Sequence, residues 1–422
     1  MMSKQRARRV WLGAPAAAWV ALAGAGIGVG VALPRSAVAA EEKKKEKEQS
    51  VSPEIGKKLK AAKEAIDKSD FDAGIALARE AVAASSKPYD LETSLRYLQF
   101  GASKKLDWDA YAEAAEQLLK FDTLTPDERL KSYKALAQIY GQQKNYGRAA
   151  EYATKWGESG GGFDAYSLLS QLYLIQKDCK NGIAALEKSV EAAARPPNEE
   201  EMRRQNSCYY QLGDKPRRQA ANEGLVLRFL KKDYYTDLVN LYHEQNMDPR
   251  ALLHLYRFGY DRSFLTRETE FIDYVAEALD VGAPVEAEAV IAKGTELGAM
   301  KFIAASDRNS RMREQAKLQA AEDRKGLAQF DKDARAGKSG EVDVKLGLVY
   351  LGFGDNKKAV EAIQRGLEPE RVGKVKRIDD ANMTLGIAYA RLGDKEGATK
   401  AFTAAKADPR MEKAAAVWLS AL

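Results

Sequence analysis

The sequence predicts an all-α protein in which short helical hairpins stack into a solenoid. Apolar residues recur at helical spacing along most of the chain, and this spacing itself repeats. No run of alternating β-branched residues indicates a sheet. At 422 residues the chain is long for one compact core. A solenoid avoids that limit because each hairpin contacts only its neighbours.

The clearest hairpin occupies residues 379–410, where two short amphipathic helices are expected around a turn at 392–394. Leu385 marks the apolar stripe of the first helix and Phe402 that of the second. Gly386 falls where the two helices cross, and its missing side chain lets their backbones approach. This spacing resembles that of a tetratricopeptide repeat, a helical hairpin of about 34 residues. Because one hairpin cannot bury both of its faces, such units stack.

Weaker copies of the pattern recur upstream, so we expect about nine repeat units in a right-handed superhelix. Residues 53–302 contain seven of these units, residues 339–410 contain two more, and residues 411–422 form a capping helix. Residues 303–338 are strongly polar and have only a thin apolar stripe. We interpret them as a degenerate unit or a hinge.

Residues 1–40 have the composition of an export signal peptide. A basic start precedes the apolar run 10–33, and small residues around Ala39 and Ala40 form a cleavage pattern. This segment carries five of the 67 basic side chains and no acidic one, which leaves 62 basic against 61 acidic residues. The basic charge therefore belongs to targeting, and we expect no nucleic-acid partner. Residues 41–52, rich in Lys and Glu, are expected to form a disordered linker.

Two features leave open by which route the protein is exported and whether the N-terminal segment is cleaved. Arg8-Arg9 before an apolar run resembles a twin-arginine signal, so we keep both the general secretory and the twin-arginine route. An apolar run of about 24 residues is also long enough to span a bilayer. The alternative to a cleaved periplasmic protein is therefore a structural protein anchored in the inner membrane and facing the periplasm.

Several stretches go beyond a generic repeat, namely residues 163–171, 264–270, 282–287 and 414–422. Together they resemble exported tetratricopeptide proteins of TonB energy-transduction systems, and the likeness covers most of residues 55–422. The resemblance implies a periplasmic, non-catalytic adaptor that acts near TonB, ExbB and ExbD, with a protein partner and no cofactor. Arg218 and Asn222 depart from the pattern because apolar residues are expected at both positions.

Cys179 and Cys208 are the two cysteines of the chain. An exported protein meets an oxidising compartment. Their positions in two adjacent antiparallel helices would place the two thiols at the same height along the helix axes. We therefore hypothesise a disulfide between them. Closing a loop of about 30 residues would stabilise the fold by about 3–4 kcal/mol in the chain-entropy model. The alternative is a pair of buried free thiols.

Residues 157–161 match the G-x-S-x-G pattern of a hydrolase, with Ser159 as the nucleophile. That pattern needs a strand before it and a histidine partner. Here a helix is expected before it, and His243 and His254 are the two histidines of the chain. We favour a loop between repeats and keep a hydrolase as the second interpretation. Two histidines and two cysteines also argue against a dedicated metal site.

The first helix of each unit is expected to line the concave side of the solenoid. By register this face includes Arg96, Gln138, Gln142, Gln171, Tyr210, Asn240, His243 and Met383. Amide side chains there suit an extended peptide, whose backbone groups need hydrogen-bond partners. The alternative is an inner face that is only solvated. We therefore expect a scaffold for a protein or extended peptide of the cell envelope.

Overall fold

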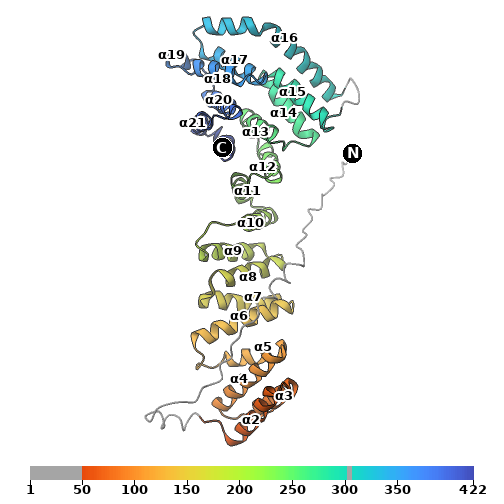
Figure 1. The fold of residues 1–422 in the computed structure, drawn as a ribbon, viewed down its shortest axis with the longest axis vertical. Coiled ribbons are helices and arrows are strands. Elements are labelled where there is room, and N and C mark those ends of the chain that lie inside the picture. Colours follow the sequence, from red (N-terminus) through yellow and green to blue (C-terminus); the bar gives the residue numbers. More distant parts are fainter. Residues whose placement is uncertain (1–49, 302–306) are drawn as a thin grey trace. The chain divides into compact units, whose positions relative to one another are not determined.

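The computed structural model describes residues 50–301 and 307–422 (Figure 1). All regular structure in these residues is helical, which confirms the all-α prediction. The expected export signal and residues 41–49 of the expected linker lie outside the described residues. No helix in the described part combines the length and the hydropathy that a bilayer span requires.

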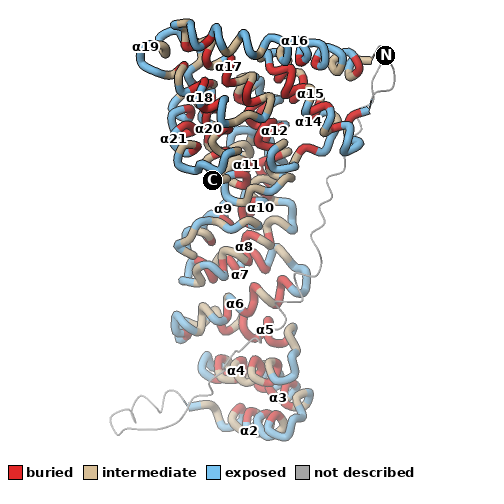
Figure 2. The backbone as a smooth tube through the Cα atoms, turned by 45° about the horizontal axis from the view of Figure 1, so that its top comes forward, coloured by how far each residue is buried: buried red, intermediate tan, exposed pale blue. Residues whose placement is uncertain are grey.

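The described residues divide into two compact units, one within Met1–Pro196 and one within Pro197–Leu422, which we call the N-terminal and the C-terminal unit. Four hairpins follow one another in the N-terminal unit. They are α2 (Pro53–Asp67) with α3 (Phe71–Ala84), α4 (Pro88–Lys105) with α5 (Trp108–Leu118), α6 (Pro126–Gln142) with α7 (Tyr146–Trp156), and α8 (Gly162–Ile175) with α9 (Cys179–Ala192). The π-helical segment η2 (Gly157–Gly161) joins α7 to α8. Buried and exposed residues alternate along each helix, as stacked amphipathic helices require (Figure 2).

The C-terminal unit contains more helices than the N-terminal unit, and not all of them form hairpins. They are α10 (Glu199–Gln211), α11 (Lys215–Phe229), α12 (Lys232–Glu244), α13 (Pro249–Asp261), α14 (Glu268–Asp280), α15 (Pro284–Glu296), α16 (Arg308–Ala336), α17 (Gly340–Gly352), α18 (Asn356–Gly366), α19 (Pro369–Val372), α20 (Ile378–Leu392), α21 (Lys395–Lys406) and α22 (Glu412–Leu419). Hairpins pair α10 with α11, α12 with α13, α14 with α15, α17 with α18, and α20 with α21. The repeat pattern thus continues through this unit.

Many hairpins have the same type of turn between their two helices. A residue with positive φ precedes an Asp or Asn at Ser69, Leu106, Lys144, Lys177, Gly213, Gly354 and Gly393. The Asp or Asn then accepts a hydrogen bond from a backbone N–H three residues later, as Asp394 does from Gly397 at 2.9 Å. This bond caps the second helix of the hairpin. Glycine adopts a positive φ without steric cost, whereas a side chain such as that of Leu106 makes it strained.

Small residues lie where the paired helices cross. A Cβ atom at Gly386 would lie 2.5 Å from the ring of Phe402, and one at Gly74 would lie 2.4 Å from Cγ1 of Ile66. No side chain fits at such distances, so the close approach of the helices depends on glycine. The role that the sequence predicted for Gly386 is confirmed.

Residues 308–336 form one continuous helix, α16, instead of a hairpin. Its fully buried residues are small ones, Ser310, Ala316, Ala320 and Ala334, through which it packs beside α15 and α17. The rest of the helix is largely exposed, in keeping with the polar sequence. Leu318, for example, is 66% exposed.

The C-terminal unit differs from a simple stack because α13 packs against α20 and α22. Trp418 of α22 donates a hydrogen bond from its indole N–H to the backbone oxygen of His254 at 2.9 Å. The ring of Trp418 also lies 5.2 Å from that of Phe258 in α13 and 5.4 Å from that of Phe402 in α21. The expectation that every hairpin contacts only its neighbours is therefore wrong for this unit. Apolar faces far apart in sequence bury each other in one core.

Candidate functional site

The structure brings two of the predicted binding residues together in the N-terminal unit. Gln138 of α6 and Gln171 of α8 line one groove with a volume of about 240 Å³. The other lining residues are Lys134, Trp156, Asp164, Ser167 and Leu168. The groove therefore spans two successive first helices of the repeat, as the predicted register requires.

The polar groups of this groove have no partners within the described chain. The amides of Gln138 and Gln171, the carboxylate of Asp164 and the hydroxyl of Ser167 make no hydrogen bond or ion pair with a described residue. The ammonium group of Lys134 lies 5.4 Å from the ring centroid of Trp156, a cation–π contact. Donors and acceptors thus remain available above an apolar floor.

The floor is made by Trp156, which is 4% exposed, and Leu168, which is 8% exposed. Gly161 makes room for the indole ring, because a Cβ atom there would lie 2.5 Å from Nε1 of Trp156. Gly160 has φ +99° in the same segment, a conformation that favours glycine. The glycine-rich sequence between α7 and α8 therefore shapes the groove.

The same segment contains Ser159, the nucleophile of the hydrolase interpretation. It follows α7 rather than a strand, and its side chain is exposed within η2. His254 is completely buried in the C-terminal unit, and His243 lies on α12 of that unit. Within the described residues, Ser159 therefore lacks the strand–turn–helix geometry of a nucleophile elbow.

The remaining predicted residues of the N-terminal unit lie apart from the groove. Arg96 forms ion pairs with Glu92 at 3.0 Å and Glu128 at 2.8 Å, which joins α4 to α6. Gln142 is exposed at the end of α6 and does not line the groove. Arg96 is thus engaged in packing between hairpins.

In the C-terminal unit, three predicted residues are accessible to solvent. Tyr210 on α10 is 60% exposed, and the guanidinium group of Arg218 lies 4.8 Å from its ring centroid. Asn240 on α12 accepts a hydrogen bond from Nη2 of Arg267 at 3.3 Å. His243 is exposed near the end of the same helix.

The prediction that Met383 lies on an open concave face is wrong, because this side chain is completely buried. It lies one turn after Asp380, whose carboxylate pairs with Arg250 and His254 of α13. Because α13 packs against this face of α20, the surface that would be open in a simple solenoid is covered.

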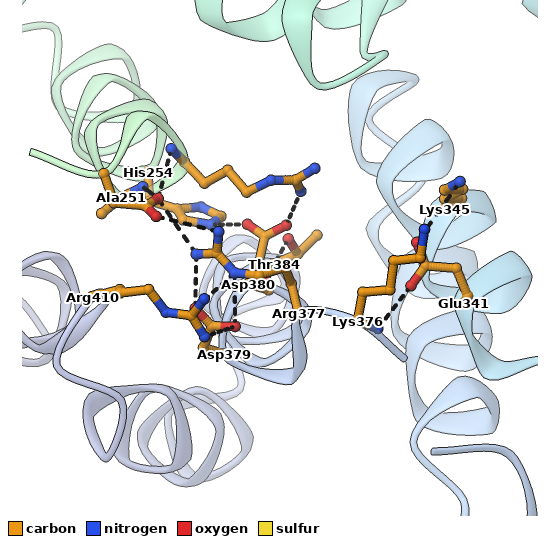
Figure 3. Close-up of polar contacts among 12 residues, drawn as sticks. Ala251, His254, Glu341, Lys345, Lys376, Arg377, Asp379, Asp380, Thr384 and Arg410 are labelled. Atoms are coloured by element: carbon orange, nitrogen blue, oxygen red, sulfur yellow. Dashed lines mark hydrogen bonds and ion pairs between the residues drawn. The ribbon is translucent and has the colours of Figure 1, made fainter. Parts of the chain in front are cut away.

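Sequence reasoning missed a buried group of charges on α13. Arg257, 1% exposed, donates to both carboxylate oxygens of Glu286 at 2.7 and 2.6 Å, and Tyr274 donates to the same carboxylate. Figure 3 shows His254 directed from α13 toward Asp380 of α20, where Nε2 and Oδ1 are 2.8 Å apart. The sequence did contain one signal for this group, a stripe of polar residues on the otherwise apolar helix α13.

These contacts shift the pKa values of the group. Burial alone would raise the pKa of Glu286, but the charge and hydrogen bonds of Arg257 and the bond from Tyr274 hold it at about 2. Burial lowers the pKa of His254, so the neutral imidazole is favoured. Burial opposes ionisation of Asp380 as well, yet His254 and Arg250 keep its pKa well below the usual range. The group is thus satisfied internally and stabilises the α13–α20 contact.

The predicted disulfide would join the two units, since Cys179 begins α9 in one and Cys208 lies in α10 of the other. It stays a prediction. Mass measurement after alkylation without reductant tests it, because two alkylated thiols would contradict the bond. Among the described residues, no cluster of three or more His, Cys, Asp or Glu side chains could hold a metal ion.

The hairpins, their shared turn and the small residues at the crossings define an all-α protein of the tetratricopeptide-repeat class. Neither a family model nor a curated protein matches the sequence. Among solved structures, the chain is similar to a tetratricopeptide repeat protein from Parabacteroides merdae, with 10% identity over 64% of this chain and 99% of that one (TM-score 0.29).

Two further solved structures resemble the chain to a comparable degree. One is Naa15/Naa10 bound to HypK-THB, with 15% identity over 89% of this chain and 61% of that one (TM-score 0.28). The other is the P58(IPK) TPR domain, with 12% identity over 86% of this chain and 96% of that one (TM-score 0.23). The fold class rests on the hairpins themselves rather than on these superpositions.

Proposed function

We propose that the protein is a non-catalytic scaffold that binds an extended segment of a partner protein in the groove between α6 and α8. One observation carries the proposal: Gln138, Asp164, Ser167 and Gln171 line one groove, and their side chains make no hydrogen bond or ion pair with the described chain. These groups are open to solvent, so a segment that enters the groove can replace water as their hydrogen-bond partner.

The amides of Gln138 and Gln171 match the needs of a peptide backbone. Each amide offers two N–H donors and a carbonyl acceptor, and each backbone unit of an extended segment offers one donor and one acceptor. Both amides line the same groove, whose apolar floor is formed by Trp156 and Leu168. We therefore expect the two amides to bind backbone groups of one extended segment, with an apolar side chain over Trp156.

We further infer an exported protein whose partner belongs to a TonB-type envelope assembly. The composition of residues 1–40 and the resemblance of four stretches to exported repeat proteins support this inference. A mature N-terminus near Ala40 or Glu41 is expected. Retention of residues 1–40 would instead favour the inner-membrane anchor.

A double substitution tests the groove. Photo-crosslinking from position 167 in intact envelopes, followed by mass spectrometry, would capture and identify the bound protein. Gln138→Ala with Gln171→Ala removes two backbone hydrogen bonds of about 0.5–1.5 kcal/mol each. We expect about tenfold weaker binding of the captured segment. Gln142→Ala, an amide of α6 outside the groove, is the matched control. Equal binding by the double variant and the control would refute the proposal.

A further inference from the structure

The contact between α13 and α20 is held by polar pairs between residues far apart in the sequence. Asp380 near the start of α20 pairs with Arg250 and His254 of α13. Arg391 near the end of α20 pairs with Asp261 of α13 at 2.9 Å. The two helices belong to separate hairpins, α12 with α13 and α20 with α21. The contact is therefore a junction between two hairpins, each of which forms from neighbouring residues.

His254 lies between these pairs, and the hydrogen bonds of its ring determine which nitrogen carries the proton. The side chain is completely buried. Its Nδ1 atom lies 3.1 Å from Nη1 of Arg257, and a guanidinium group donates hydrogen bonds but does not accept them. Nδ1 therefore accepts, and the proton of the neutral ring is on Nε2, which donates to Oδ1 of Asp380 at 2.8 Å (Figure 3). The neutral ring thus uses both of its nitrogens.

The charges around His254 balance as long as its ring is neutral. Arg250 and Arg257 bring two positive charges, which Asp380 and Glu286 compensate. A proton added at Nδ1 would remove the acceptor of Arg257 and place a second cation 3.1 Å from its guanidinium group. Burial opposes this added charge more strongly than Asp380 attracts it, and it lowers the pKa of His254. The closed contact therefore excludes the proton.

The other titratable groups of this site keep their charge state between about pH 7 and pH 5. Burial opposes the ionisation of Glu286 and Asp380, but their partners keep both pKa values far below this range, at about 2 for Glu286. Burial raises the pKa of Tyr235 of α12 and that of Tyr274 of α14 well above the usual value, so both hydroxyls stay neutral. His254 is thus the member of the site that is expected to titrate in this range.

Further charged side chains beside this part of α13 are paired with one another. These pairs are Arg377 with Asp248 and Asp379, Arg410 with Asp379, Arg391 with Asp261, and Lys413 with Glu223. Helix α22 adds the neutral indole of Trp418, which donates to the backbone oxygen of His254 at 2.9 Å. Protonation of His254 is therefore the change in charge that mild acid brings to this contact.

Separation of α13 from α20 would place the imidazole in water, where its pKa is about 6.5. The open arrangement then binds a proton that the closed arrangement excludes. The closed arrangement is therefore fully stable above about pH 6.5 and loses stability as the pH falls below that value. From about pH 7 to pH 5 the ratio of open to closed molecules should rise by up to about 25-fold.

The two hairpins keep their own packing when this contact opens. The ring of Tyr235 in α12 lies 5.9 Å from that of Phe258 in α13. In the other hairpin, Phe402 of α21 packs where Gly386 of α20 leaves room for its ring. These contacts join the two helices of one hairpin, and they contain no group that titrates in mild acid. Acid therefore acts on the junction rather than on the hairpins.

We propose that the α13–α20 contact is an acid-sensitive latch: a proton bound by His254 favours separation of α13 from α20 and uncovers the face of α20 that carries Met383. Met383 lies one turn after Asp380 and is completely buried while the contact is closed. Its side chain therefore reports whether the latch is open. The latch lies in the C-terminal unit and does not depend on the groove of the N-terminal unit.

Oxidation of methionine by hydrogen peroxide measures this opening in the full-length chain. The reaction needs an accessible thioether, and peptide mass spectrometry gives its rate at each methionine. From about pH 7 to pH 5, the rate at Met383 should rise by up to about 25-fold. Met202 of α10 and Met300 beside α15 are 8% and 3% exposed but lie outside α13 and α20, so their rates should change less than about twofold. No rise at Met383, or an equal rise at all three positions, would overturn the latch.

His254→Gln is the decisive variant because glutamine reproduces the hydrogen bonds but binds no proton. Its carbonyl can accept from Arg257, and its amide N–H can donate to Asp380. The rise at Met383 should then fall below about threefold. His243→Gln, the same substitution at the exposed histidine of α12, should keep the full rise. A full rise in His254→Gln would assign the effect to another group and refute the role of His254.

The protonation state of His254 is measured separately in the His243→Gln variant, where it is the single histidine of the chain. Nitrogen-15 NMR of labelled histidine at about pH 7 should show a neutral ring with its proton on Nε2. A charged ring, or a proton on Nδ1, would contradict the hydrogen bonds with Arg257 and Asp380 on which the latch depends. This measurement changes nothing at the site, so it tests the latch even where His254→Gln fails to fold.

Discussion

Replacement of Asn222 by leucine should stabilise the C-terminal unit. Asn222 lies in α11, is completely buried, and neither atom of its side-chain amide has a hydrogen-bond partner. The repeat pattern requires an apolar residue at this position. Leucine has nearly the shape of asparagine, so Asn222→Leu removes the unpaired polar group without leaving a cavity.

The expected size follows from this environment. A buried polar group without a partner costs about 1–3 kcal/mol of folding free energy. Asn222→Leu should therefore raise the free energy of unfolding by about 1–3 kcal/mol. For a unit of this size, about 1 kcal/mol shifts the melting temperature by about 2–4 °C. The melting temperature should rise by several degrees.

Thermal and urea unfolding followed by circular dichroism measure this change. Asn222→Ala is the matched control, because it removes the amide but leaves a cavity, so its net effect should be close to zero. Asn222→Asp should lower the melting temperature, because an unpaired charge would be buried. A lower melting temperature for Asn222→Leu would refute the reasoning, since it would mean that the amide is hydrogen-bonded, for instance to a buried water.

Three further predictions concern stability. Burial lowers the pKa of His254. Below pH 6.5 this imidazole therefore binds a proton in the unfolded chain but stays neutral in the folded chain. The free energy of unfolding should then fall with decreasing pH by up to about 1.4 kcal/mol per unit, and urea unfolding between pH 7 and 5 should show less slope in His254→Gln. Glu286→Gln leaves Arg257 buried without a counter-charge and should cost about 3–5 kcal/mol, whereas Glu286→Leu with Arg257→Met should recover most of that loss in the same assay. Leu106 has φ +64° and is exposed, so Leu106→Gly should stabilise the N-terminal unit by about 1 kcal/mol, whereas Gly393→Ala at φ +78° should destabilise its turn by a similar amount. A lower melting temperature for Leu106→Gly would contradict the strain that its backbone indicates.

The sequence alone determined the hairpin. Apolar spacing, the small residue at a helix crossing and the glycine–aspartate turn are local features that act within about 34 residues. Gly386 against Phe402 was predicted on that basis and is confirmed. Gln138 and Gln171 were placed on one face by helix register alone, and they do line one groove. The shared turn was only partly recognised, because residues such as Leu106 or Lys144 can supply the positive φ that glycine supplies elsewhere.

Only the tertiary structure decided which faces remain open. The contacts of α13 with α20 join residues about 130 positions apart, as in the pair of His254 with Asp380, and no local pattern encodes such a partner. This packing buries Met383, whose helical register by itself places it on an exposed face. It also determines which charges pair: Glu286 meets Arg257 of α13, and Asp380 meets Arg250 and His254 of the same helix. The physical reason is that helix formation and hairpin pairing depend on neighbours in sequence, whereas burial and charge pairing depend on neighbours in space.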